Sequence, residues 1–212
     1  RNGLPASGLP PVPPALERQM NRLNLTWDRM SGNATEIIQR QDLLLALAEA
    51  SAEFSDRIPG LQESADDAVK YLTESGAPAQ QVFTASRQLV LADRMLRRVG
   101  EILQGGSKAV SAADNLKREM QLFEQALAAL LRGSKTLGLT PVLNTGALAS
   151  LGDVRSLFAE AKPDIETVLG SATDLFKVRG AADEIFLDSR KAFEQAGDRS
   201  GAVKVQLSFA EA

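Results

Sequence analysis

The 212-residue chain contains no cysteine and no histidine. Their absence excludes disulfides, zinc sites made of Cys and His, Ser-His-Asp and Cys-His nucleophiles, and di-iron sites of the Glu-x-x-His type. An enzyme would have to work with carboxylates or lysine alone, and acidic neighbours such as Glu63 and Asp67 fit a solvated helix face better than an acid–base pair. We therefore expect no enzymatic activity, no metal and no cofactor.

A large excess of one charge is lacking as well, and so are long apolar runs. The formal net charge is -3 and the two signs are interspersed. No basic stripe can therefore follow a phosphate backbone, and nucleic acid is not an expected partner. No apolar run approaches the roughly 18 residues of a membrane helix, so the sequence predicts no membrane span and no signal peptide within these residues.

Aromatic residues make up only 5% of the chain, whereas 44% of it is hydrophobic, with Ala and Leu the commonest. This composition is typical of packed helices, because thin side chains let helices approach closely. The clearest pattern lies in residues 41–75, where core positions recur in steps of three and four through Pro59: Leu44, Leu47, Ser51, Phe54, Ile58, Leu61, Ala65, Ala68 and Leu72. We predict one helix about 50 Å long, and an all-α, elongated, antiparallel helical bundle.

Other segments also have helical periodicity: 16–40, 78–103, 109–131, 147–170 and 174–196. Gly and Thr around residues 170–173 predict a break between the last two helices. The predicted core positions of the helix 78–103 are Val82, Ala85, Leu89, Ala92, Leu96, Val99 and Leu103. Trp27, Phe158 and Phe193 are expected to point into the core.

An internal repeat relates two parts of the chain. A shift of 131 residues aligns Trp27 with Phe158 and Leu47 with Val178, and a shift of 130 aligns the proline-bearing loops 8–12 and 138–142. Any two heptad helices align to some degree, so the helices alone favour neither a chance alignment nor a true duplication. The matching loop and a helix break in the same place favour a duplication.

The repeat predicts two modules. Residues 1–60 would be the C-terminal half of a first module, residues 61–196 a complete second module of four helices, and residues 197–212 a tail that we do not place. The first module begins directly with its proline loop, so we expect its two leading helices to lie in a longer protein of which this chain is a fragment.

Residues 76–94 (GAPAQQVFTASRQLVLADR) resemble the first helix of the PilJ-type sensory domain family, whose pattern is close to Gly-Arg-Gln-Arg-Met-Leu-Ser-Gln-Arg. Residues 121–123 (QLF) and 174–186 (DLFKVRGAADEIF) are similar to the same family, and the resemblance runs from the proline loop to about residue 196. The family occurs in methyl-accepting receptors of type IV pilus chemosensory systems.

The resemblance implies two stacked four-helix modules, the first incomplete here, in the periplasmic portion of a bacterial inner-membrane receptor. Such a receptor would regulate pilus function and twitching motility through a chemosensory adaptor and a histidine kinase, by displacement of packed helices. A pilin subunit is the family-implied periplasmic partner, and a homodimer is expected. The alternative is a structural or adaptor rod that binds pilin or another protein and has no small-molecule ligand.

The candidate binding residues lie on the helix 78–103. Arg87, Gln88 and Arg94 match the family motif, and Leu91 and Arg98 share their helical stripe. Single-module relatives use this helix, paired with its copy in a dimer, to bind nitrate. Here Leu89, Ala92 and Asp93 replace the motif's Arg, Ser and Gln, which removes positive charge and a hydroxyl and adds a carboxylate.

Two interpretations of this stripe remain open. It could be a solvated basic face, or a second contact surface for a partner helix or a small anion that uses Val90 and Leu91 among the arginines.

Overall fold

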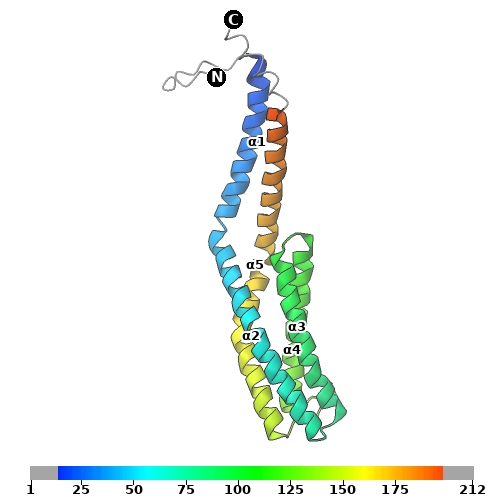
Figure 1. The fold of residues 1–212 in the computed structure, drawn as a ribbon. Helices are drawn as coiled ribbons and strands as arrows, with labels where there is room; N and C mark the ends of the chain where they lie inside the picture. Colours follow the sequence, from blue (N-terminus) through cyan, green and yellow to red (C-terminus); the bar gives the residue numbers. More distant parts are fainter. Residues whose placement is uncertain (1–13, 198–212) are drawn as a thin grey trace. The chain divides into compact units, whose positions relative to one another are not determined.

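The computed structural model describes residues 14–197, and it confirms the all-α prediction (Figure 1). The helices are α1 (Pro14–Ile38), α2 (Gln41–Glu74), α3 (Ala79–Leu103), α4 (Ser107–Arg132) and α5 (Thr145–Gly197). Within these residues no helix is both long and apolar enough to cross a membrane. Nearly all of the proline loop and of the tail predicted at 197–212 lies outside the described residues.

The chain divides into two compact units. Unit 1 comprises Arg1–Arg40 with Val178–Ala212, and unit 2 comprises Gln41–Lys177. Unit 2 therefore contains α2, α3, α4 and the first part of α5, and unit 1 contains α1 and the last part of α5. The module boundary between residues 60 and 61 stays a prediction.

Helix α2 is continuous through Pro59, as predicted. From Leu47 to Leu72 every predicted core position is buried. A proline inside a helix removes one backbone hydrogen bond and costs about 3 kcal/mol or more. Phe54, Ile58 and Leu61 flank Pro59 and are almost fully buried, and their packing offsets that cost.

Short connections make the neighbouring helices of unit 2 antiparallel. Residues 75–78 join α2 to α3, and residues 104–106 join α3 to α4, with Gly76, Gly105 and Gly106 at positive φ. Side chains of all four helices form one hydrophobic core. Phe123 of α4 and Phe158 of α5 stack in it with ring centroids 4.5 Å apart.

The predicted break near residues 170–173 is wrong, because α5 runs without interruption from Thr145 to Gly197. The Ser171 hydroxyl donates to the backbone oxygen of Thr167 at 2.8 Å. Val168, Ser171 and Ala172 are buried. Packing of this face stabilises the helix against the weak intrinsic propensity of Gly170 and its neighbours.

The core of α3 also differs from the prediction. Its buried residues are Gln81, Thr84, Ala85, Gln88, Leu91, Ala92, Met95, Val99 and Ile102. Leu89 and Leu96 are only partly buried and Leu103 is 39% exposed. The buried stripe thus passes through 81, 88, 95 and 102 rather than 82, 89, 96 and 103.

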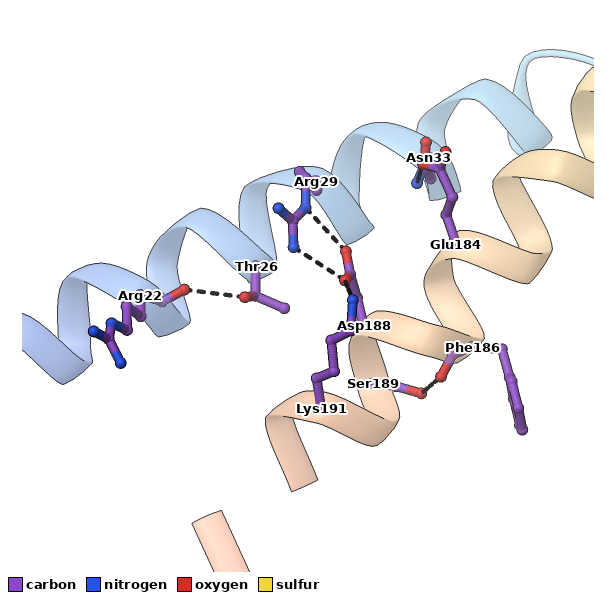
Figure 2. Close-up of polar contacts among 9 residues, drawn as sticks. All are labelled: Arg22, Thr26, Arg29, Asn33, Glu184, Phe186, Asp188, Ser189 and Lys191. Carbon is purple, nitrogen blue, oxygen red and sulfur yellow. Dashed lines mark hydrogen bonds and ion pairs between the residues drawn. The ribbon is translucent and has the colours of Figure 1, made fainter. Parts of the chain in front are cut away.

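In unit 1, polar contacts join α1 to the last part of α5 (Figure 2). The Arg29 guanidinium donates from Nε and one Nη to the two carboxylate oxygens of Asp188, both at 3.0 Å, and the Asn33 amide donates to Glu184 at 2.9 Å. Asp188 is buried, and Lys191 lies 3.8 Å from its carboxylate. This two-point ion pair fixes α1 against α5.

Trp27 and Phe193 do not lie in a core, contrary to the prediction. Their exposed fractions are 67% and 79%. Within the described part of unit 1 only α1 and the last part of α5 are present, so no further helix covers these rings. Phe158, the position that aligns with Trp27, is 4% exposed as predicted.

Candidate partner-binding surface on α3

Helix α3 presents one side to the core of unit 2 and the opposite side to solvent. It starts after Pro78, whose carbonyl oxygen accepts hydrogen bonds from the N–H groups of Gln81 and Val82. Pro78 at the N-cap has φ -53°, which suits the entry into a helix. The helix is therefore anchored at its start and presents side chains at fixed angular positions.

The solvent side carries four residues that follow one another at steps of four, three and four: Phe83, Arg87, Val90 and Arg94. We call these four the outer face of α3. Phe83 is 61% exposed and Val90 48% exposed. Side chains three and four positions apart are neighbours on a helix, so the face alternates apolar and cationic groups.

A groove of about 280 Å³ follows the outer face, lined by Phe83, Ser86, Arg87, Val90, Leu91 and Arg94. Arg87 and Arg94 form no ion pair with any described residue, in contrast to Arg97, which pairs with Asp93 at 2.9 Å. Two unpaired guanidinium groups beside exposed apolar surface suit a partner that offers carboxylates and apolar side chains.

The five predicted binding residues do not form one surface. Arg87 and Arg94 lie on the outer face, and Leu91 lines its groove although it is only 1% exposed. Gln88 is 0% exposed and lies in the core, so it cannot meet a partner at the surface. Phe83 was missed, and its spacing of four from Arg87 and seven from Val90 is the signal that could have identified it.

Arg98 belongs to an internal ion-pair network. Its Nη1 donates to Glu101 at 2.8 Å, and its Nε lies 3.6 Å from a carboxylate oxygen of Glu119 on α4. The hydrogen bond with Glu101 raises the pKa of the Arg98 guanidinium above its ordinary value, against the opposing effect of burial, and the charges of Glu101 and Glu119 raise it further. Arg98 thus joins α3 to α4, and its side chain is 30% exposed.

Gln88 is the least expected residue of the core. Neither its amide oxygen nor its amide nitrogen has a hydrogen-bond partner among the described residues. Each buried polar group that lacks a partner costs about 1–3 kcal/mol. The packing of α3 around Gln88 is therefore less stable than an apolar core of the same shape would be.

The comparisons with known proteins agree with the resemblance noted in the sequence. The family model described as PilJ, type IV pili methyl-accepting chemotaxis transducer N-term, matches residues 71–183. Protein PilJ of Pseudomonas aeruginosa is 34% identical over 195 residues, which cover 92% of this chain and 29% of that protein. A putative methyl-accepting chemotaxis protein, AlkN, of Alcanivorax borkumensis is 34% identical over 178 residues, which cover 84% of this chain and 26% of that protein.

This chain spans less than a third of the length of either relative. The match at residues 71–183 extends from the end of α2 through α3 and α4 into the last part of α5. It therefore includes the whole of the outer face of α3. Because the match covers more than half of the sequence, the chain belongs to the family of type IV pili methyl-accepting chemotaxis transducer N-terminal domains.

Proposed function

We propose that this chain is the periplasmic sensory part of a methyl-accepting receptor that regulates type IV pili and twitching motility through a cytoplasmic kinase pathway. Membership of the family and the names of two relatives support this role. The observation that assigns a site to this role is the outer face of α3, where two unpaired arginines alternate with exposed Phe83 and Val90.

The soluble domain of a pilin subunit is the proposed partner of this face. The groove on this face is open, and its volume of about 280 Å³ is several times that of nitrate, so it would leave such an anion largely in water. Apolar side chains between arginines are also the composition that protein interfaces favour. Both features support contact with a protein rather than enclosure of a nitrate-sized anion.

Calorimetry with the pilin soluble domain tests this proposal. The double variant Arg87→Glu/Arg94→Glu should abolish the binding heat, because it reverses both charges of the face. Arg118→Glu/Arg155→Glu is a matched control, since both residues are exposed on other helices of unit 2 and the change in net charge is the same. Equal losses in both variants, or binding that survives in the first, would refute the site.

Signalling would proceed by a small displacement of α3 within its bundle. Gln88 supports this mechanism, because a core position without hydrogen bonds lowers the stability of the present packing relative to alternatives in which the amide finds partners. Helix shifts of about 1–2 Å are a common means of transmitting binding events. The alternative function, an adaptor rod that binds a protein without responding, requires no such shift.

Spin labels distinguish the sensor from the rod. The chain contains no cysteine, so single cysteines at exposed Lys70 of α2 and Arg97 of α3 can be labelled without background. Pilin binding should change the distance distribution between the labels, and Gln88→Met should reduce the change. An unaltered distribution despite binding would favour the adaptor rod.

We further propose that unit 1 is completed by a helical hairpin from outside these 212 residues, which would make it a second four-helix module. Met20, Leu23 and Trp27 are 39%, 45% and 67% exposed. The positions 131 residues later, Leu151, Val154 and Phe158, are 1%, 0% and 4% exposed in a core shared with α3 and α4. The same heptad positions are thus covered in one unit and open in the other.

Trp27 is the chain's single tryptophan and reports on this covering directly. Its emission in the 212-residue chain should be that of a solvated indole, and in the full-length receptor the emission of the same indole, isolated by comparison with Trp27→Phe, should shift to the blue. Emission that stays at the solvated position in the full-length receptor would refute a covering hairpin.

A further inference from the structure

A second pocket lies at the end of unit 2 where α2 turns into α3 and the loop from α4 enters α5. It holds about 450 Å³ and is lined by Leu72, Ser75, Ala77, Pro78, Gln81, Thr140, Pro141, Leu143 and Asn144. We call it the end pocket. It shares no lining residue with the groove on α3, and none of its lining side chains carries a charge.

The loop that forms one wall of the end pocket is held by a continuous set of hydrogen bonds. Gln81 donates from Nε2 to the backbone oxygens of Thr140 at 2.9 Å and Pro141 at 3.3 Å. The Val142 N–H donates to the Leu130 oxygen at 2.9 Å. Gly133 has φ +80°, and a Cβ there would stand 2.9 Å from the Pro141 ring. The pocket is therefore preformed rather than shaped by a ligand.

The floor and the rim of the end pocket differ in exposure. Leu72 on the floor is 1% exposed and Gln81 is 5% exposed. Leu143 on the rim is 86% exposed, the largest value among the large apolar residues described. An exposed leucine on a loop held this firmly keeps its apolar surface in water unless a partner covers it.

Two polar groups of the lining are free to bind. No described residue donates a hydrogen bond to Oε1 of Gln81, whose Nε2 is fully engaged. Asn144 accepts from the Ala147 N–H through Oδ1 at 2.8 Å, which leaves its Nδ2 as a donor. One acceptor and one donor complement the N–H and C=O of a peptide group.

We infer that the end pocket binds an apolar, uncharged side chain presented by an extended segment of a partner protein. The uncharged lining is complementary to such a side chain, and the free Gln81 and Asn144 groups are complementary to the flanking backbone. Because the rim is exposed, a small molecule would remain largely in water, whereas a protein segment also covers Leu143 and Pro141. The inference concerns a surface other than the outer face of α3 and does not depend on it.

Three capped peptides test the inference by NMR titration of the ¹⁵N-labelled 212-residue chain: acetyl-Ala-Leu-Ala-amide, acetyl-Ala-Ala-Ala-amide and acetyl-Ala-Asp-Ala-amide. The leucine peptide should shift the amide signals of residues 75–81 and 140–144. The alanine peptide should bind about tenfold more weakly, because it buries a smaller apolar side chain. The aspartate peptide should bind more weakly still, because the uncharged pocket would have to bury a charge.

Leu143→Asp should weaken binding of the leucine peptide about tenfold or more. Leu137→Asp is the matched control, since Leu137 is 47% exposed on the same loop and does not line the pocket. Either leucine is exposed enough to be replaced without unfolding the chain. Absence of shifts at the end pocket, equal shifts with the aspartate peptide, or equal losses in both variants would overturn the inference.

Discussion

The ring of Tyr71 in α2 lies against Gly146 in the first turn of α5. A Cβ added to Gly146 would stand 2.9 Å from the ring Cδ1 and 3.0 Å from Cε1. We expect Gly146→Ala to lower the free energy of unfolding by about 1–3 kcal/mol, because the methyl group would displace the ring. Thermal or urea unfolding measures this loss.

Two further variants separate the contact with Tyr71 from a general effect of alanine. In a Tyr71→Leu background the cost of Gly146→Ala should fall. Gly152 has no atom within 4 Å of its added Cβ, so Gly152→Ala should stabilise α5 by about 0.5–1 kcal/mol. A Gly146→Ala chain as stable as the parent would show that the ring moves aside freely.

Phe158 and Trp27 should respond in opposite ways to truncation. Phe158→Ala should destabilise unit 2 by about 3–5 kcal/mol, because it removes a buried ring stacked on Phe123. Trp27→Ala in the 212-residue chain should change stability by less than about 0.5 kcal/mol, since its ring is 67% exposed. Urea unfolding checks both, and a large cost at Trp27 would mean that its ring is covered already in this chain.

The helices that could be predicted are those in which local and long-range signals agree. In α2 the heptad spacing, the phase through Pro59 and the burial of Leu47 to Leu72 coincide. At residues 170–173 the local and the long-range signals conflict. Gly170 and Thr173 weaken the helix locally, but burial of Val168 and Ala172 against other helices maintains it, and that tertiary contribution is invisible in the segment alone.

The outer face of α3 was only half predictable for a similar reason. The run Leu89-Val90-Leu91 is apolar on three sides of α3, so periodicity allows two positions of the core that differ by one residue. Gln81 and Gln88 are polar and made the true core look like surface. Gln81 is buried with its amide donating to the loop before α5, whereas Gln88 is buried without hydrogen-bond partners. Neither arrangement can be predicted from the spacing of residues in the sequence.

Gln88 and Gln81 provide a matched pair of buried glutamines. Gln88→Met should raise the free energy of unfolding by about 1–3 kcal/mol, because it removes two polar groups without partners from the core. Gln81→Met should lower it by a similar amount, because Thr140 and Pro141 lose their donor. Thermal unfolding of both variants gives the sign, and a loss at both positions would indicate that Gln88 has partners in solution.

The ion pair between Arg29 and Asp188 should govern the stability of α1. Arg29→Met should increase hydrogen exchange in α1 by an amount equivalent to about 1–2 kcal/mol, because Asp188 is buried while the Arg29 side chain is 60% exposed and partly screened. A double-mutant cycle with Asp188→Asn isolates the coupling. Additive effects of the two substitutions would contradict a direct pair.

Lys162 of α5 should stabilise unit 2 in a manner that depends on pH. Its Nζ donates to the Glu124 carboxylate of α4 at 2.7 Å, and this hydrogen bond, with the charge of Glu124, raises the pKa of the Lys162 ammonium above its ordinary 10.5. A raised folded-state pKa means that the stabilisation is complete below 10.5 and is lost as the pH rises through the folded-state value.

Urea unfolding of the wild type and of Lys162→Met between neutral and strongly alkaline pH measures this dependence. The difference in stability between the two should stay constant up to about pH 10, where the lysine is charged in both folded and unfolded chains, and should shrink above it. Lys108 forms no ion pair with a described residue, so Lys108→Met is the control for loss of a lysine side chain as such. A difference that persists undiminished at high pH would mean that Lys162 stabilises the bundle through its methylene chain and not through its charge.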